Sequence, residues 1–150
     1  MTNIRVGLVS GLIAVLITSA INIVCRLIGL LPEQLDMKYM AIVFVNPLTA
    51  PITAFWLGLV IHILIGVIAG AAFEVLVKQS TPLKGVIFSL LAVWLGMVLV
   101  VFPIAGFGFF GLNVGAVMPV ATFLLNVVYG SAVGALAQRF ERLQPAWSQP

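Results

Sequence analysis

The stretch from residue 55 to residue 77 reads FWLGLVIHILIGVIAGAAFEVLV, and it decides the fold class. A helix of about 20 mostly apolar residues crosses the roughly 30 Å of hydrocarbon in a bilayer. Only His62 and Glu74 carry an ionisable side chain within this stretch. A run so long and so apolar predicts a membrane-spanning helix.

Three further stretches have the same character, at about residues 6–31, 85–102 and 116–137. Strands of a membrane barrel would alternate apolar and polar positions, and these continuous runs do not. We therefore predict an all-α membrane protein, a four-transmembrane-helix bundle that forms one domain over residues 1–150.

The composition excludes several classes of protein. Of the 150 residues, 63% are hydrophobic and 7% are charged, against about 25% charged residues in a soluble domain. The charges are scattered, so no basic groove for nucleic acid is expected. One cysteine and one histidine give no disulfide and no metal-ligand cluster. Because no catalytic constellation or phosphate loop is present either, we predict neither an enzyme nor a cofactor.

Lysines and arginines indicate the orientation, because they favour the cytoplasmic ends of membrane helices. One end of the predicted helices collects Arg5, Lys78, Lys84, Arg139 and Arg142. The connections at the other end hold Lys38, beside Glu33 and Asp36. We predict a multi-pass protein of the bacterial inner membrane with both termini cytoplasmic, whose first run stays as a signal anchor.

The connection between the first two helices contains MKYMAIVFV at residues 37–45. This segment is too short to span a bilayer and too apolar for water, so we predict a short interfacial or re-entrant helix. The connection at residues 103–115 carries phenylalanines among glycines. We expect it to fold back on the bundle, because aromatic side chains favour the membrane interface.

The chain also repeats itself. The pattern His62-x3-Gly66-x3-Gly70 returns as Asn126-x3-Gly130-x3-Gly134. In the preceding helices, Gly7 and Gly11 match Gly85 and Ser89 in spacing. We predict two parallel-related helix-pair repeats, at about residues 1–78 and 79–150, around a pseudo-twofold axis along the membrane normal. The alternative is that small residues four positions apart are common in any spanning helix.

Glycines four positions apart let two helix backbones approach closely. We predict helix-packing faces at Gly7, Gly11, Gly66, Gly70, Gly130 and Gly134. These faces serve contacts within the bundle or, alternatively, a dimer interface.

An ionisable residue inside a membrane is a functional candidate. For His62 we expect a hydrogen bond to Asn126, with a proton or substrate role and metal or haem ligation as alternatives. Glu74 precedes Lys78 by four residues, which favours an ion pair at the helix surface; turned inward, it would couple proton movement. Asn22 and Tyr129 complete a putative intramembrane polar site, which either lines a path or ties helices together.

Arg26 is expected to reach the outer interface and to pair with Glu33 or Asp36.

Several motifs carry a resemblance to a known family. They are FPIAG at residues 102–106, FGLNVG at 110–115, MPV at 118–120, the Tyr129-Gly130 pair, GLVSG at 7–11 and His62-x3-Gly66. The chain resembles an uncharacterised family of small four-helix bacterial membrane proteins, a domain of unknown function. The resemblance implies a histidine in both halves, and Asn126 replaces the second one here.

These observations support two hypotheses about function. The first is a helix-packing or accessory subunit of a membrane complex or homo-oligomer, with the lipid bilayer and other membrane subunits as partners. The alternative is a small dimeric transporter or channel with a polar path through His62, Asn126 and Glu74.

Overall fold

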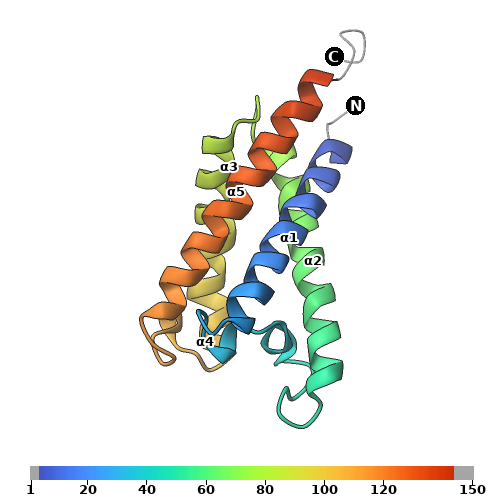
Figure 1. Cartoon of the computed structure of the whole chain (residues 1–150). Helices are drawn as coiled ribbons and strands as arrows, with labels where there is room; N and C mark the ends of the chain where they lie inside the picture. The colour runs from blue at the N-terminus through green and yellow to red at the C-terminus, as the bar shows by residue number, and fades with distance from the viewer. Residues whose placement is uncertain (1–3, 144–150) are drawn as a thin grey trace.

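The computed structural model describes residues 4–143 and contains four long helical segments (Figure 1). They are α1 (Ile4–Leu27), α2 (Pro51–Leu76), the third span (Pro82–Ile104) and α5 (Val117–Leu143). All four are long and apolar enough to cross a membrane. No strand occurs among the described residues, so the predicted all-α, four-helix fold is confirmed.

The third span is not a regular α-helix. It begins as α3 (Pro82–Phe88), where the Thr81 side chain caps the helix by accepting a hydrogen bond from the backbone of Lys84. It then forms two π-helical segments, η3 (Ser89–Trp94) and η4 (Met97–Val101), before the short α4 (Phe102–Ile104). Such wide turns are rare and are frequently found at functional sites.

The four spans are arranged with the first and last helices in the middle. α1 packs against α2 and against α5, and α5 packs against α3. The ends of α1 and α5 nearest the chain termini lie at the same end of the bundle (Figure 1). The hydroxyl of Tyr129 on α5 also donates a hydrogen bond to the carbonyl of Gly66 on α2, at 2.6 Å, which links the two halves of the chain.

The predicted glycine faces lie at contacts between helices of the same chain. A Cβ atom added to Gly70 would lie 2.5 Å from the Cα of Gly11 and 2.5 Å from the carbonyl oxygen of Gly7. A Cβ added to Gly130 would lie 2.5 Å from the carbonyl oxygen of Gly85. Since these neighbours are backbone atoms, glycine is what allows α1 to approach α2 and α3 to approach α5 this closely.

The α1–α2 contact and the α3–α5 contact use equivalent backbone atoms. A Cβ on Gly11 would meet the carbonyl oxygen of Gly66 and the backbone of Gly70. A Cβ on Gly85 would meet the carbonyl oxygen of Gly130 and the backbone of Gly134. In these contacts, therefore, Gly85 takes the place of Gly11, whereas spacing alone matches it with Gly7.

Two apolar clusters fill the bundle. Towards the end with the termini, Phe73, Val133 and Ala137 are fully buried, and the ring of Phe73 lies 5.6 Å from that of Phe88 on the third span. At the other end, Val98 and Met118 pack with neighbouring aromatic rings. In the half of the bundle nearer the termini, side chains thus join α2 to the third span.

The first outer connection contains two short 3-10 helices, η1 (Glu33–Leu35) and η2 (Met37–Ala41). The helix predicted over residues 37–45 therefore ends at Ala41, and turns follow. η2 packs against α2, with the Met37 carbonyl against Gly58, because glycine leaves room for it there.

The second outer connection folds back as expected, with Gly106 and Gly108 at φ of 80° and 73°. Its Phe107 ring contacts Tyr39 of the first connection, at a centroid distance of 6.1 Å. The two outer connections therefore meet over the end of the bundle.

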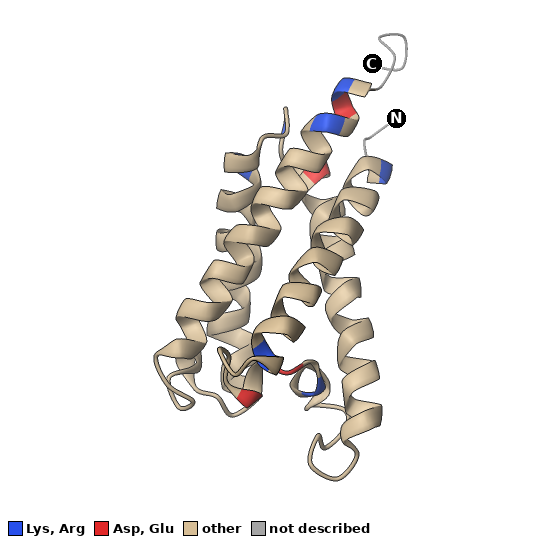
Figure 2. Ribbon diagram, in the orientation of Figure 1, with Lys and Arg blue, Asp and Glu red and all other residues tan. Residues whose placement is uncertain are grey.

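Charged side chains gather at the two ends of the bundle, as Figure 2 shows. At the outer end Arg26 pairs with Asp36 at 3.8 Å, one of the two partners predicted for it. Glu33 instead pairs with Lys38, at 2.7 Å. The hydrogen bond from Lys38 lowers the pKa of Glu33, and the same bond raises the pKa of Lys38.

Candidate functional site

A cavity of about 460 Å³ lies between α2 and the third span and is backed by α1 and α5. Its polar lining comes from three helices: Thr18 and Asn22 on α1, His62 on α2, and Asn126 and Tyr129 on α5. The rest of the lining is apolar, and no lysine, arginine, aspartate or glutamate contributes to it. Four of the five residues predicted as an intramembrane polar site thus line one cavity.

The cavity is bounded at both ends and open at one side. Met40 of η2 lines the end away from the chain termini, and Phe88, which packs on Phe73, lines the end nearer to them. The lining residues Ile65, Ile68 and Val101 are 44%, 66% and 48% exposed. The opening therefore lies between α2 and the third span, on the apolar flank of the bundle.

His62 and Asn126 both line the cavity, but the predicted hydrogen bond between them is absent. Asn126 donates to the carbonyl of Thr122 at 2.9 Å and accepts from the hydroxyl of Ser89 at 3.1 Å. The amide prefers these partners because they lie on its own helix and on the adjacent α3–η3 segment. Within residues 4–143, the imidazole of His62 forms no hydrogen bond.

Asn22 is 7% exposed, and its side chain forms no hydrogen bond to any described residue. Its Oδ1 atom is fully buried without a partner. Tyr129 differs, because its hydroxyl already donates to Gly66. An amide without a partner in an apolar interior is costly. Among the polar residues that line the cavity, Asn22 and His62 are those whose side chains form no hydrogen bond to a described residue.

Glu74 lies outside the cavity, near the end of α2. The hydroxyl of Ser80 lies 2.6 Å from its Oε1 and 3.1 Å from Oε1 of Glu141 on α5. The predicted ion pair with Lys78 is not formed, because α2 ends at Leu76 and Lys78 follows the helix. The structure therefore does not join Glu74 to His62 and Asn126, because the buried Phe73 and the partly buried Phe88 pack between α2 and the third span there.

Two features of the site escape sequence reasoning. Ser89 is recognisable as an intramembrane polar residue, but nothing in the sequence pairs it with Asn126. The indole of Trp94 donates to the hydroxyl of Thr122 at 3.1 Å, which fixes η3 against α5. Both are contacts between residues distant in the chain, and spacing gives no signal for them.

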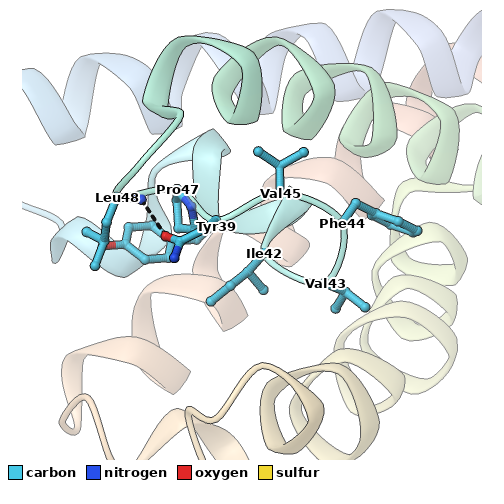
Figure 3. A pocket seen from close by; sticks show the side chains of 8 residues that line it. Tyr39, Ile42, Val43, Phe44, Val45, Pro47 and Leu48 are labelled. Atoms are coloured by element: carbon cyan, nitrogen blue, oxygen red, sulfur yellow. Dashed lines mark hydrogen bonds between the residues drawn. The ribbon is translucent and has the colours of Figure 1, made fainter.

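A second hollow of about 530 Å³ lies in the connection between α1 and α2, lined by Tyr39 and residues 42–48 (Figure 3). One loop forms it, with the side chain of Asn46 accepting from the backbone of Leu48 at 2.9 Å. Phe44 at its rim is 73% exposed. Since a single loop supplies every wall, we take the cavity between the helices as the candidate site.

Comparison with curated proteins and with solved structures gave no match. A family model described as "Family of unknown function (DUF6789)" matches residues 1–148. This match covers nearly the whole four-helix chain, including every helix that lines the cavity. The chain therefore belongs to DUF6789, a family of unknown function.

Proposed function

We propose that this protein is an integral membrane protein that binds a lipid-soluble molecule in the cavity between α2 and the third span. The observation that carries the proposal is a side-opening cavity of about 460 Å³ with unpartnered polar side chains on its wall. Ligand cavities in proteins commonly measure about 300–1,000 Å³ and are mostly apolar with a few polar groups.

The position of the opening favours a ligand that arrives through the bilayer. In a membrane, the flank that carries Ile65 and Ile68 faces lipid, and both residues are exposed in the chain alone. A molecule dissolved in the acyl chains can enter there without crossing water. Because the inner end is filled by Phe73 and Phe88, we favour binding over passage through the bundle, which the transporter hypothesis requires.

The accessory-subunit hypothesis remains compatible with this function, since a subunit can hold a ligand for a larger complex. The glycine faces, however, no longer support it. The glycine faces are occupied by contacts inside the chain, so an assembly with other subunits or with a second copy would use the lipid-facing surfaces. The cytoplasmic placement of both termini in a bacterial inner membrane stays part of the proposal, supported by the basic residues at that end.

The topology has its own test. In a variant with Cys25 replaced by serine, single cysteines placed at Gln79 and at Leu112 should react with an impermeant maleimide from opposite sides of the membrane. Labelling of both from the same side would contradict the orientation.

We also propose that the two helix pairs derive from duplication, with Gly11 equivalent to Gly85. The matching backbone contacts to Gly66 and Gly130 support this register. This register differs by one helical turn from the one based on spacing, which matched Gly7 with Gly85. In this register, Val15 is equivalent to Ser89.

The binding proposal is tested by filling the cavity. Gly96 lines it, and a Cβ at this position would meet no heavy atom within 4 Å. Gly96→Leu should therefore fold normally and exclude the ligand. The control is Leu91→Phe on the same span, where Leu91 is 64% exposed and outside the cavity.

Each protein is purified in nanodiscs, and small molecules that remain bound are extracted and quantified by mass spectrometry. We expect a compound that is retained by the wild type and by Leu91→Phe and is depleted in Gly96→Leu. Equal retention by all three proteins would refute the proposal.

A further inference from the structure

We infer that His62 and Asn22 bind a carbonyl oxygen of a neutral, lipid-soluble ligand. The inference rests on the proposed function and specifies the chemistry of the same cavity. It follows from a difference between the two helix pairs, from the state of the Asn22 amide, from the uncharged lining and from the depth of the polar groups.

The first argument is the difference between the pairs. In the second pair, Ser89 donates to the side chain of Asn126 at 3.1 Å. In the first pair, the equivalent of Ser89 is Val15, whose Cβ lies 2.5 Å from the position of a Cβ on Gly66. Valine has no hydroxyl, so His62 lacks the partner that Asn126 has. Of the two equivalent polar residues, His62 is thus the one without a hydrogen-bond partner among the described residues, and it lines the cavity.

The second argument concerns Asn22. Its Oδ1 is shut off from the cavity, since it is fully buried without a partner. The amide nitrogen also has no hydrogen-bond partner among the described residues, but it is not among the fully buried atoms. The group that Asn22 offers to a ligand in the cavity is therefore an N–H donor. The imidazole of His62 offers a second N–H donor in either protonation state, and two donors suit an acceptor such as a carbonyl oxygen.

The third argument is charge. No charged side chain lines the cavity, and an isolated carboxylate or phosphate in an apolar interior is strongly disfavoured. The ligand's polar group is accordingly neutral.

The depth of His62 in the bilayer distinguishes between two sources of the carbonyl, a phospholipid ester and a dissolved molecule. His62 lies eleven positions beyond Pro51, the first residue of α2, which is about 16 Å along the helix at 1.5 Å per residue. His62 is thus near the middle of the 26-residue α2, so we expect it near the middle of a bilayer that this helix spans. The ester carbonyls of phospholipids lie at the edge of the hydrocarbon. We therefore assign the carbonyl to a molecule dissolved among the acyl chains.

The test compares two probes of matched shape, decyl-benzoquinone and decylbenzene, which differ in their carbonyl groups. Binding to the full-length protein in nanodiscs is measured by gel filtration, with empty nanodiscs as background. We expect the quinone to bind more tightly. His62→Leu and Asn22→Leu should each weaken quinone binding about 2- to 12-fold, the effect of one net hydrogen bond, and leave decylbenzene unchanged.

Two further variants separate binding from folding. His62→Asn keeps an N–H donor of the kind present at Asn126 and should restore most of the quinone affinity lost in His62→Leu. Ser89→Ala removes a polar group outside the cavity lining and should lower the melting temperature with little effect on quinone affinity. Affinity losses that follow the melting temperatures across all four variants would overturn the inference.

The bilayer lipid tests the source of the carbonyl. Quinone affinity should be equal in nanodiscs of ester-linked and of ether-linked phosphatidylcholine. Clearly tighter binding in the ether lipid would mean that lipid esters compete for the site, which overturns the assignment to a dissolved molecule. If decylbenzene binds as tightly as the quinone while Gly96→Leu blocks both, the carbonyl inference fails and the binding function stands. If Gly96→Leu blocks neither probe, both fail.

Discussion

Replacing Gly70 by alanine tests the close contact between α1 and α2. The added Cβ would lie 2.5 Å from the Cα of Gly11 and 2.5 Å from the carbonyl oxygen of Gly7. Carbon atoms pack best at about 3.5–4.0 Å, so the two helices must separate by about 1.0–1.5 Å. Neither neighbour can rotate away, because both are backbone atoms. Overpacking of this kind costs about 1–3 kcal/mol.

Gly96→Ala is the matched control, since a Cβ there has no heavy atom within 4 Å. Within a helix, alanine is favoured over glycine by about 1 kcal/mol. Gly70 also lies inside a helix, so the same gain reduces its net cost to about 0–2 kcal/mol. At about 2–4 °C per kcal/mol for a chain of this size, Gly70→Ala should lower the melting temperature in detergent by at most about 8 °C. Gly96→Ala should leave it unchanged or raise it. Equal effects of the two substitutions would refute the argument that glycine is required by the contact.

Two further predictions concern single hydrogen bonds. Thr122→Val removes the acceptor of the Trp94 indole and should cost about 1–3 kcal/mol, because a part-buried donor is left unpaired. Adding Trp94→Phe removes the donor as well and should recover part of the loss in thermal unfolding. Lys38→Gln should return the lowered pKa of Glu33 towards its ordinary value, measured by NMR titration of the carboxyl. Because the pKa of Glu33 is lowered, the pair stabilises the fold above the ordinary glutamate pKa, and this stabilisation is lost as the pH falls through the lowered pKa. Because the pKa of Lys38 is raised, the stabilisation is also lost at alkaline pH, as the pH rises through the raised pKa.

The spans were predictable because they depend on a local property, the length of an apolar run. The predicted bounds differ from the observed ones mainly at the ends. The first run was expected to reach residue 31, but α1 ends at Leu27, and Gly29 adopts a φ of 76°. The last run was expected to end at residue 137, but α5 continues to Leu143, since a helix does not stop where its hydropathy falls.

The partners of the polar residues were less predictable. Arg26 pairs with Asp36 as predicted because the two are close in the chain: Arg26 lies in the last turn of α1, and Asp36 lies in the connection that follows. The bond predicted between His62 and Asn126 assumed that equivalent positions face each other. Asn126 instead uses Ser89 and Thr122, a choice that depends on how the third span is rotated. The π-helical segments that set this rotation have no signature in hydropathy.

The central position of α1 and α5 has a consequence for how the protein is made. The ribosome makes α1 first and α5 last. α1 therefore enters the membrane before α5, against which it packs in the middle of the bundle, has been made. The polar residues Ser10 and Thr18 of α1 are buried in the complete bundle, where α1 contacts both α2 and α5. Both hydroxyls bond to carbonyls of their own helix, Ser10 to Val6 and Thr18 to Ala14. These two hydroxyls therefore keep an internal partner before α5 is made, whereas Ser19 and Asn22 of the same helix are buried without one among the described residues.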